Sequence, residues 1–282
     1  MITSLHPLLN ILLLSLMASL GTGLGGLIAI IRKPGRRSYG LLMGITAGVM
    51  ISLSFLELVN KAWEMAGPLT ATIGFGVGAT FMFLVDYFAP HIRFGEKEVR
   101  GRDAQIDHKA PFGKSQGKHH SGRMRGKNQI VDRKLVNTGL LLAVGITLHN
   151  LPEGIAVGAG YLLNPQFGFF IAVAILLHNI PEGIATALPL CKGGVCRWDA
   201  FKVAFLSGLA EPVGALLAGL FLVNFQNLVP GALAFAGGVM VFITLDELIP
   251  TAREYGHDHF TAIGIILGSL FVFILSGIFG VR

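Results

Sequence analysis

The chain has 282 residues, of which 52% are hydrophobic and 13% are charged, and its formal net charge is +6. A soluble domain carries about 25% charged residues, so the composition excludes an ordinary soluble protein. The basic residues lie in short clusters between long apolar runs, which is typical of membrane orientation signals and argues against nucleic-acid binding. We therefore predict an all-α protein whose helices form a bundle across a lipid bilayer.

Apolar runs of about 20 residues, the length that spans a bilayer, recur along the whole chain. Eight are predicted: 7–31, 39–60, 69–90, 135–160, 167–190, 200–223, 229–250 and 260–281. The first lacks a basic stretch before it, so it is interpreted as a retained helix and not as a signal peptide. All basic residues except Lys61 and Arg282 lie in or beside every second connection. The positive-inside rule then places these connections in the cytoplasm and both termini outside.

The longest hydrophilic segment, residues 91–134, separates three predicted helices in 1–90 from five in 135–282. It is basic, rich in glycine and poor in apolar residues, which predicts a flexible cytoplasmic loop. The loop contains His91, His108, His119 and His120. Two interpretations stay open: a metal-sensing loop, and a solvated loop that serves topology alone.

The two cysteines, Cys191 and Cys196, fall near the cytoplasmic side of the predicted topology. A structural disulfide is not expected in that compartment. A metal-binding pair and ordinary thiols both remain as alternatives.

Two predicted helices carry nearly the same polar motif, His-Asn-x-Pro-Glu-Gly. The copies occupy residues 149–154 and 178–183, near the middle of the fourth and fifth helices. Both copies would therefore lie close to the bilayer midplane. Because consecutive helices run in opposite directions, an inverted pseudo-two-fold axis would relate them, and many transporter sites lie at such an axis.

The spacing within each motif suits metal ligation. The histidine and the glutamate are four residues apart and share one helix face, and the asparagine adds a carbonyl oxygen from a rotated direction. The proline frees a backbone carbonyl one turn earlier, which membrane helices tolerate where they line a cavity. The six candidate ligands are His149, Asn150, Glu153, His178, Asn179 and Glu182.

A seventh candidate ligand, Glu211, lies near the middle of the sixth predicted helix. An isolated charge at that depth costs about 2.5–3.5 kcal/mol on insertion scales, so three glutamates need compensation. Two divalent cations would balance three carboxylates, and two neutral imidazoles supply nitrogen ligands that suit Zn²⁺. Protonated glutamates that only join helices are the competing interpretation, but they do not account for two copies of the motif.

Four further acidic residues extend the line of carboxylates to either side of this cluster. Glu57 lies near the outer end of the second helix and Asp86 near the inner end of the third. Asp246 and Glu247 lie near the inner end of the seventh. We expect a metal entrance at Glu57 and a release route past the other three, with headgroup-level residues that solvate helix ends as the alternative.

The paired motifs resemble those of the ZIP (Zrt/Irt-like protein) family of metal transporters, and most closely its bacterial zinc-uptake branch. The resemblance extends over the eight helices, the outward termini, the histidine-containing loop and Glu211. It implies a binuclear centre whose first metal is held by His149, Glu153, His178 and Glu182. The second metal is then held by Asn150, Asn179 and Glu211, with Glu153 and Glu182 bridging.

The resemblance also implies uptake into the cytoplasm by alternating access, in which one helix group slides against another. Zinc is the expected cargo, and iron, manganese, cobalt and cadmium stay open; no cofactor and no enzymatic activity are expected. A bacterial cytoplasmic membrane, with the lipid bilayer and the metal ions as partners, is the implied setting. The abundance of glycine leaves a homodimer open.

The alternative function is an intramembrane metalloenzyme, a di-metal hydrolase or oxidase. The chain lacks the His-Glu-x-x-His motif of zinc proteases, and its His-x-x-x-Glu order differs from the Glu-x-x-His of di-iron proteins. A passive cation channel would share the acidic residues. A multi-ligand site at the midplane favours binding and release over free conduction.

Overall fold

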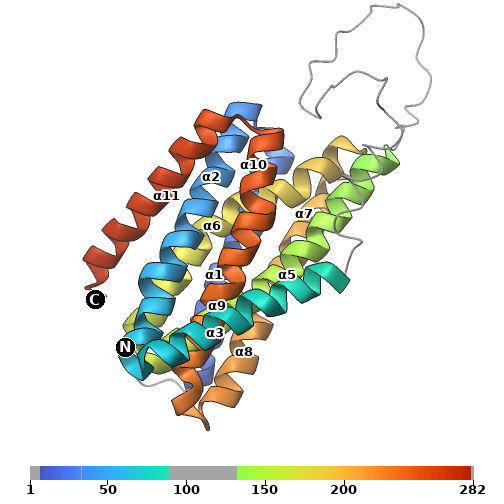
Figure 1. Cartoon of the computed structure of the whole chain (residues 1–282). Coiled ribbons are helices and arrows are strands. Elements are labelled where there is room, and N and C mark those ends of the chain that lie inside the picture. The colour runs from blue at the N-terminus through green and yellow to red at the C-terminus, as the bar shows by residue number, and fades with distance from the viewer. Residues whose placement is uncertain (1–6, 33, 89–131, 281–282) are drawn as a thin grey trace, which may run out of the picture.

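The computed structural model describes residues 7–32, 34–88 and 132–280, which form helices joined by short turns (Figure 1). Seven stretches in this part of the chain are long and apolar enough to cross a membrane, so the predicted all-α, multi-pass membrane protein is confirmed. The α-helices are α1 (Pro7–Ile31), α2 (Arg36–Ser52), α3 (Asn60–Phe88), α5 (Arg133–Leu163), α6 (Pro165–Lys192), α7 (Arg197–Gly208), α8 (Ala210–Leu222), α9 (Val229–Ile243), α10 (Ile249–Tyr255) and α11 (Asp258–Phe279). Between them lie the π-helical segments η1 (Leu53–Val59) and η4 (Thr244–Leu248) and the 3-10 segment η3 (Gln226–Leu228).

The observed helices follow the predicted apolar runs to within a few residues at most ends. The predicted loop 91–134 is the part that the structure does not test. Its four histidines lie outside the described residues, and only its last three residues are described, with α5 already begun at Arg133.

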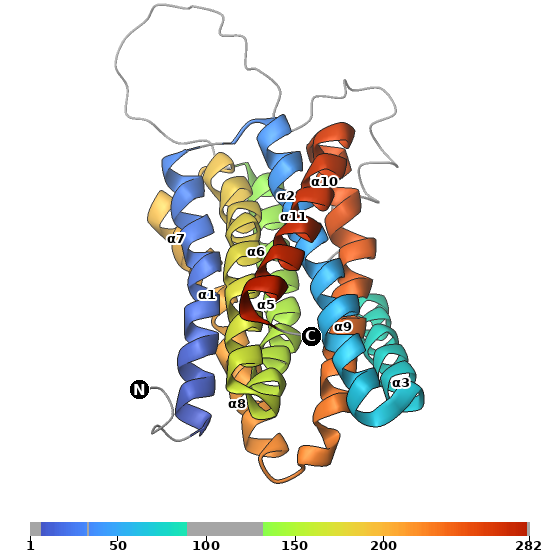
Figure 2. The same ribbon diagram turned by 90° about the vertical axis from the view of Figure 1, so that its left-hand side faces the viewer.

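The helical stretch from Arg36 to Phe88 is broken at Gly67. A straight helix of this length would measure about 80 Å, far more than the hydrocarbon core of roughly 30 Å. Gly67 has φ 79°, inside a stretch that is otherwise helical. Glycine adopts this conformation readily, and Pro68, which follows it, has no N–H to continue the hydrogen-bond ladder. The chain therefore turns back, and α3 packs against α9 (Figure 2).

Glycines bring four pairs of helices into backbone contact: α1 with α6, α5 with α8, α2 with α11, and α3 with α9. At each of these glycines an added Cβ would overlap a backbone oxygen of the partner helix. In lipid, where apolar side chains gain little by leaving their surroundings, such close approach is a main source of helix association. The glycines are Gly21, Gly25, Gly44, Gly48, Gly78, Gly154, Gly183, Gly214, Gly238, Gly264 and Gly268.

These contacts divide the described helices into two groups. The motif group consists of α1, α5, α6, α7 and α8, and it contains both copies of the polar motif. The frame group consists of α2, η1, α3, α9, η4, α10 and α11. Where the groups meet, α5 packs against α9 and α6 packs against α2 and α11. Among the described glycines, the close contacts join helices within a group and not across this boundary.

Replacing Gly268 with valine tests the glycine contacts. Its Cβ would overlap the carbonyl of Ile45 on α2, so we expect a loss of about 1–3 kcal/mol in stability, measured as a lower unfolding temperature of the purified protein. Gly277→Val on the same helix is the matched control, because an added Cβ there meets nothing within 4 Å. Equal unfolding temperatures for the two variants would contradict the role of the close contacts.

Candidate metal centre

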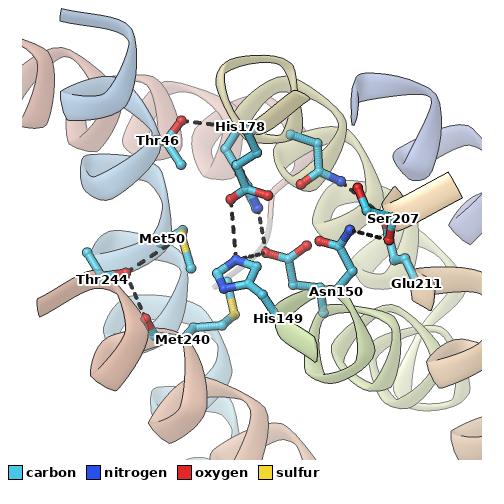
Figure 3. A network of polar contacts seen from close by, with 12 residues as sticks. Thr46, Met50, His149, Asn150, His178, Ser207, Glu211, Met240 and Thr244 are labelled. Atoms are coloured by element: carbon cyan, nitrogen blue, oxygen red, sulfur yellow. Dashed lines mark hydrogen bonds and ion pairs between the residues drawn. The ribbon is translucent and has the colours of Figure 1, made fainter. Parts of the chain in front are cut away.

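The two motifs meet because α5 and α6 are consecutive, antiparallel and joined by a very short turn. Asn164 forms this turn, and its side chain accepts a hydrogen bond of 2.8 Å from the backbone N–H of Gln166, which caps α6. Pro165 occupies the first turn, where its missing N–H costs nothing. Each motif lies near the middle of its helix, so the turn places the two copies side by side (Figure 3).

The histidines and glutamates of the motifs form one buried cluster. His149 Nε2 lies 2.9 Å from Glu153 Oε1 and 3.3 Å from Glu182 Oε1. His178 Nε2 lies 2.7 Å from the same Glu153 Oε1. One ligand atom from each of the four residues lies within 4.8 Å of the others. Ligand atoms around a single zinc ion are roughly 3–4 Å apart, since each bond is about 2 Å long, so this cluster has the dimensions of one metal site.

The two asparagines are oriented so that their oxygens, and not their nitrogens, are left for another partner. Asn150 Nδ2 donates to the backbone oxygen of Ser207 at 3.0 Å. Asn179 Nδ2 donates to Glu211 Oε2 at 3.0 Å and to the backbone oxygen of Ala18 at 3.4 Å. Both amide oxygens are buried without a hydrogen-bond donor.

Three carboxylate oxygens are in the same condition, and a fourth, Glu182 Oε1, has only His149 Nε2 nearby at 3.3 Å. A buried acceptor without a partner costs about 1–3 kcal/mol, and a buried carboxylate more. Together with the amide oxygens they form an oxygen set that a hard or borderline cation would satisfy. The carboxylate atoms are Glu153 Oε2, Glu182 Oε2 and Glu211 Oε1.

Glu211, the acceptor of the Asn179 side chain, lies at a helix start because the sixth predicted run, 200–223, is not one helix. The run breaks at Leu209, which has ψ −7°, and α8 begins at Ala210. Pro212 in the first turn of α8 lacks the N–H that would continue the helix from α7. Glu211 therefore lies at the N-terminal end of α8, where the helix dipole stabilises a negative charge.

Two methionines that the sequence analysis did not single out belong to the polar network drawn around the cluster. They are Met50 of α2 and Met240 of α9 (Figure 3), and both are fully buried. Thr244 Oγ1 lies 3.6 Å from Met50 Sδ and donates to the backbone oxygen of Met240 at 2.7 Å. Thioethers are soft ligands that suit zinc and cadmium better than manganese.

A second internal repeat could have revealed these methionines. Residues 48–50 and 238–240 both read Gly-Val-Met, and Glu-Leu follows at the same spacing in each copy, at 57–58 and 247–248. Both copies end in a π-helical segment, η1 and η4. Such segments are rare and frequently occur at functional sites.

The four predicted pathway residues all lie in the frame group, apart from the cluster. Glu57 is buried in η1 and is hydrogen-bonded to Ser276 of α11. Asp86 is buried near the end of α3, and Asp246 and Glu247 are half-buried in η4. None belongs to the grouped metal ligands found among the described residues, so their role in metal passage stays a prediction.

Comparison with known proteins agrees with the geometry of the cluster. Residues 91–276 match the family described as ZIP Zinc transporter. The chain is 38% identical over 283 residues to the zinc transporter ZupT of Akkermansia muciniphila, with 96% of this chain and 98% of the relative covered. It is 36% identical to ZupT of Clostridium perfringens, with 94% of each chain covered. The zinc transporter ZTP29 of Arabidopsis thaliana is 38% identical over 86% of this chain and 84% of its own length.

These matches identify a transporter and not an enzyme, so the alternative of an intramembrane metalloenzyme is not supported. They extend over nearly the whole chain and include both motif helices. The chain belongs to the ZIP zinc transporter family.

Proposed function

We propose that the protein takes up divalent metal ions, zinc foremost, through a binuclear site at the centre of the motif group. The observation that supports this most directly is the set of buried histidine nitrogens and unpartnered oxygens contributed by α5, α6 and α8. Two of the relatives described above are bacterial proteins named as zinc transporters. We extend that cargo to this chain and place it in a bacterial cytoplasmic membrane.

The first ion would bind between the two histidines, next to the glutamate oxygens that lie closest to the imidazole rings. Glu153 Oε1 lies within 2.9 Å of both imidazoles, whereas Glu153 Oε2 has no partner. A carboxylate with one oxygen at each site is the geometry of a bridging ligand. The second ion would then lie on the far side, among the free oxygens of Asn150, Asn179 and Glu211.

We further infer eight membrane crossings. The stretch from Arg36 to Tyr87 is one of the seven long apolar stretches, but it turns back at Gly67 and so supplies two crossings. The described basic residues at the ends of α1, α6 and α10 and the starts of α2, α5 and α7 gather at one end of the bundle (Figure 2). The positive-inside rule makes this the cytoplasmic end, with both termini outside. The antiparallel α5 and α6 would then be the inverted pair. A homodimer stays a prediction.

Alternating access follows from the division into two groups. All seven ligands predicted from the sequence lie in the motif group, and every predicted pathway residue lies in the frame group. Sliding of the motif group along the frame would carry bound metal from the level of Glu57 to that of Asp246 and Glu247. The boundary suits such motion, because no described glycine locks one backbone against the other across it.

Uptake into proteoliposomes tests the function. We expect Glu153→Ala and His178→Ala each to lower saturable zinc uptake at least about 10-fold, because each removes a ligand from the first site. Lys202→Ala is the control, since this side chain is exposed on α7 and its ion pair among the described residues is with Asp199 at 3.2 Å. Normal uptake by both ligand variants would refute the proposed function.

Metal content tests the second ion. Purified protein loaded with zinc should hold two ions per chain, and Asn150→Leu should reduce this to one while the cluster of His149 and Glu153 remains filled. The reason is that leucine preserves the volume but removes the oxygen. Elemental analysis gives the ratio directly, and an unchanged ratio in Asn150→Leu would mean that this residue holds no metal.

The entrance is tested at Glu57. Glu57→Ala should raise the apparent KM for zinc several-fold and leave Vmax within about 2-fold, because the substitution removes a carboxylate on the way to the site and not at it. Glu64→Ala is the matched control, as an exposed acidic residue on the same side that pairs with Lys61 at 3.2 Å. An unchanged KM in Glu57→Ala would rule out the entrance.

A further inference from the structure

One buried hydrogen bond crosses the boundary between the two groups at the depth of the metal cluster. Thr46 of α2 donates from Oγ1 to the backbone oxygen of His178 on α6, at 3.1 Å (Figure 3). Both residues are fully buried. The threonine belongs to the frame group, and the histidine is a candidate metal ligand of the motif group.

The burial of this bond gives it more weight than its length alone. Both partners are shielded from water in this arrangement, so solvent cannot replace the bond when it breaks, and its loss counts for more than at an exposed position. A second crossing bond shows the contrast: Gln166 Nε2 donates to the backbone oxygen of Phe279 at 2.6 Å, but in an exposed position at the outer end of the bundle. There, water can take the place of either partner.

Thr46 also has an acceptor for the arrangement in which α6 has moved away from α2. The backbone oxygen of Leu42, one turn earlier on the same helix, lies 3.4 Å from the hydroxyl. When α6 moves away, a small rotation of the side chain can bring the hydroxyl onto this oxygen. The hydroxyl is therefore satisfied in both arrangements, and it favours the present one through the shorter bond.

We propose that Thr46 is a positioning residue that holds the motif group in the present arrangement through the turn bearing His178. Its hydroxyl sets the equilibrium between this arrangement and the alternative one. The proposal rests on the alternating access described above. A net hydrogen bond of ordinary strength changes an equilibrium constant by about 2- to 12-fold, so its removal should shift the populations by this factor.

Spin labels at the same end of the two groups would report the populations. Asp199 of α7 and Asp258 of α11 are both exposed, and cysteines placed there can be labelled in a Cys191→Ser, Cys196→Ser background. Distance distributions measured on the full chain in lipid nanodiscs, with and without zinc, give the fraction of each arrangement. We expect two distances in the parent protein, and Thr46→Val, which preserves shape but removes the hydroxyl, should raise the ratio of the minor to the major population about 2- to 12-fold.

Two control variants separate the hydrogen bond from a general loss of packing. Thr46→Ser keeps the hydroxyl and should restore the parent distribution. Thr186→Val makes the same change at a fully buried threonine of α6 whose hydroxyl donates within its own helix, to the backbone oxygen of Glu182 at 3.1 Å. It should leave the populations unchanged. Thr46→Ala replaces the valine variant if that protein does not fold, with the same expectation.

The outcomes distinguish the two proposals. Equal populations in Thr46→Val and the parent, or an equal shift in Thr186→Val, would overturn the role of Thr46 while leaving alternating access in place. A single distance in every variant, with and without zinc, would instead refute the alternation on which it rests.

Discussion

Three carboxylates buried in the middle of a membrane are the constraint on which the rest of this structure depends. Each would be costly as an isolated charge, and the described cluster contains no lysine or arginine to balance them. The neighbouring polar groups are instead oriented in a way that suits the binding of a cation. The asparagine nitrogens are occupied by backbone and carboxylate acceptors, so that oxygens remain for the ion. The break at Leu209 brings a helix end to Glu211.

The same constraint explains why packing differs inside and between the two helix groups. Ligands held to a few tenths of an ångström need a rigid surrounding, and backbone contacts at glycine provide it, as where Gly154 meets the carbonyl of Glu211 itself. Gly214 makes the reciprocal contact with Leu151, inside the first motif. In the proposed mechanism the boundary between the groups slides, which requires the opposite property. There the contacts are made by side chains, which can exchange neighbours at small cost.

Much of the fold could be predicted from the sequence, because apolar length and charge placement act locally. The run 7–31 matches α1 to the residue, and the four-residue spacing of the motifs gave the geometry of the cluster. The division into two groups could not be predicted, since it depends on which distant helices a glycine approaches. Met50 and Met240 were missed because a methionine in an apolar run carries no signal by itself. Thr46 was missed because its partner is a backbone atom of a distant helix, which no residue type in the sequence indicates.

The turn at Asn164 has a consequence for how selectivity and speed are related. In the proposed mechanism α5, α6 and α8 move as one body and carry the seven predicted ligands with them, so that none of these ligands has to leave the ion while it crosses. The energy barrier to crossing then arises at the boundary, far more than in the chemistry of the ion. Evolution or design can therefore adjust the turnover rate through boundary residues without altering which metal is chosen, and can change the metal without altering the machinery that moves it.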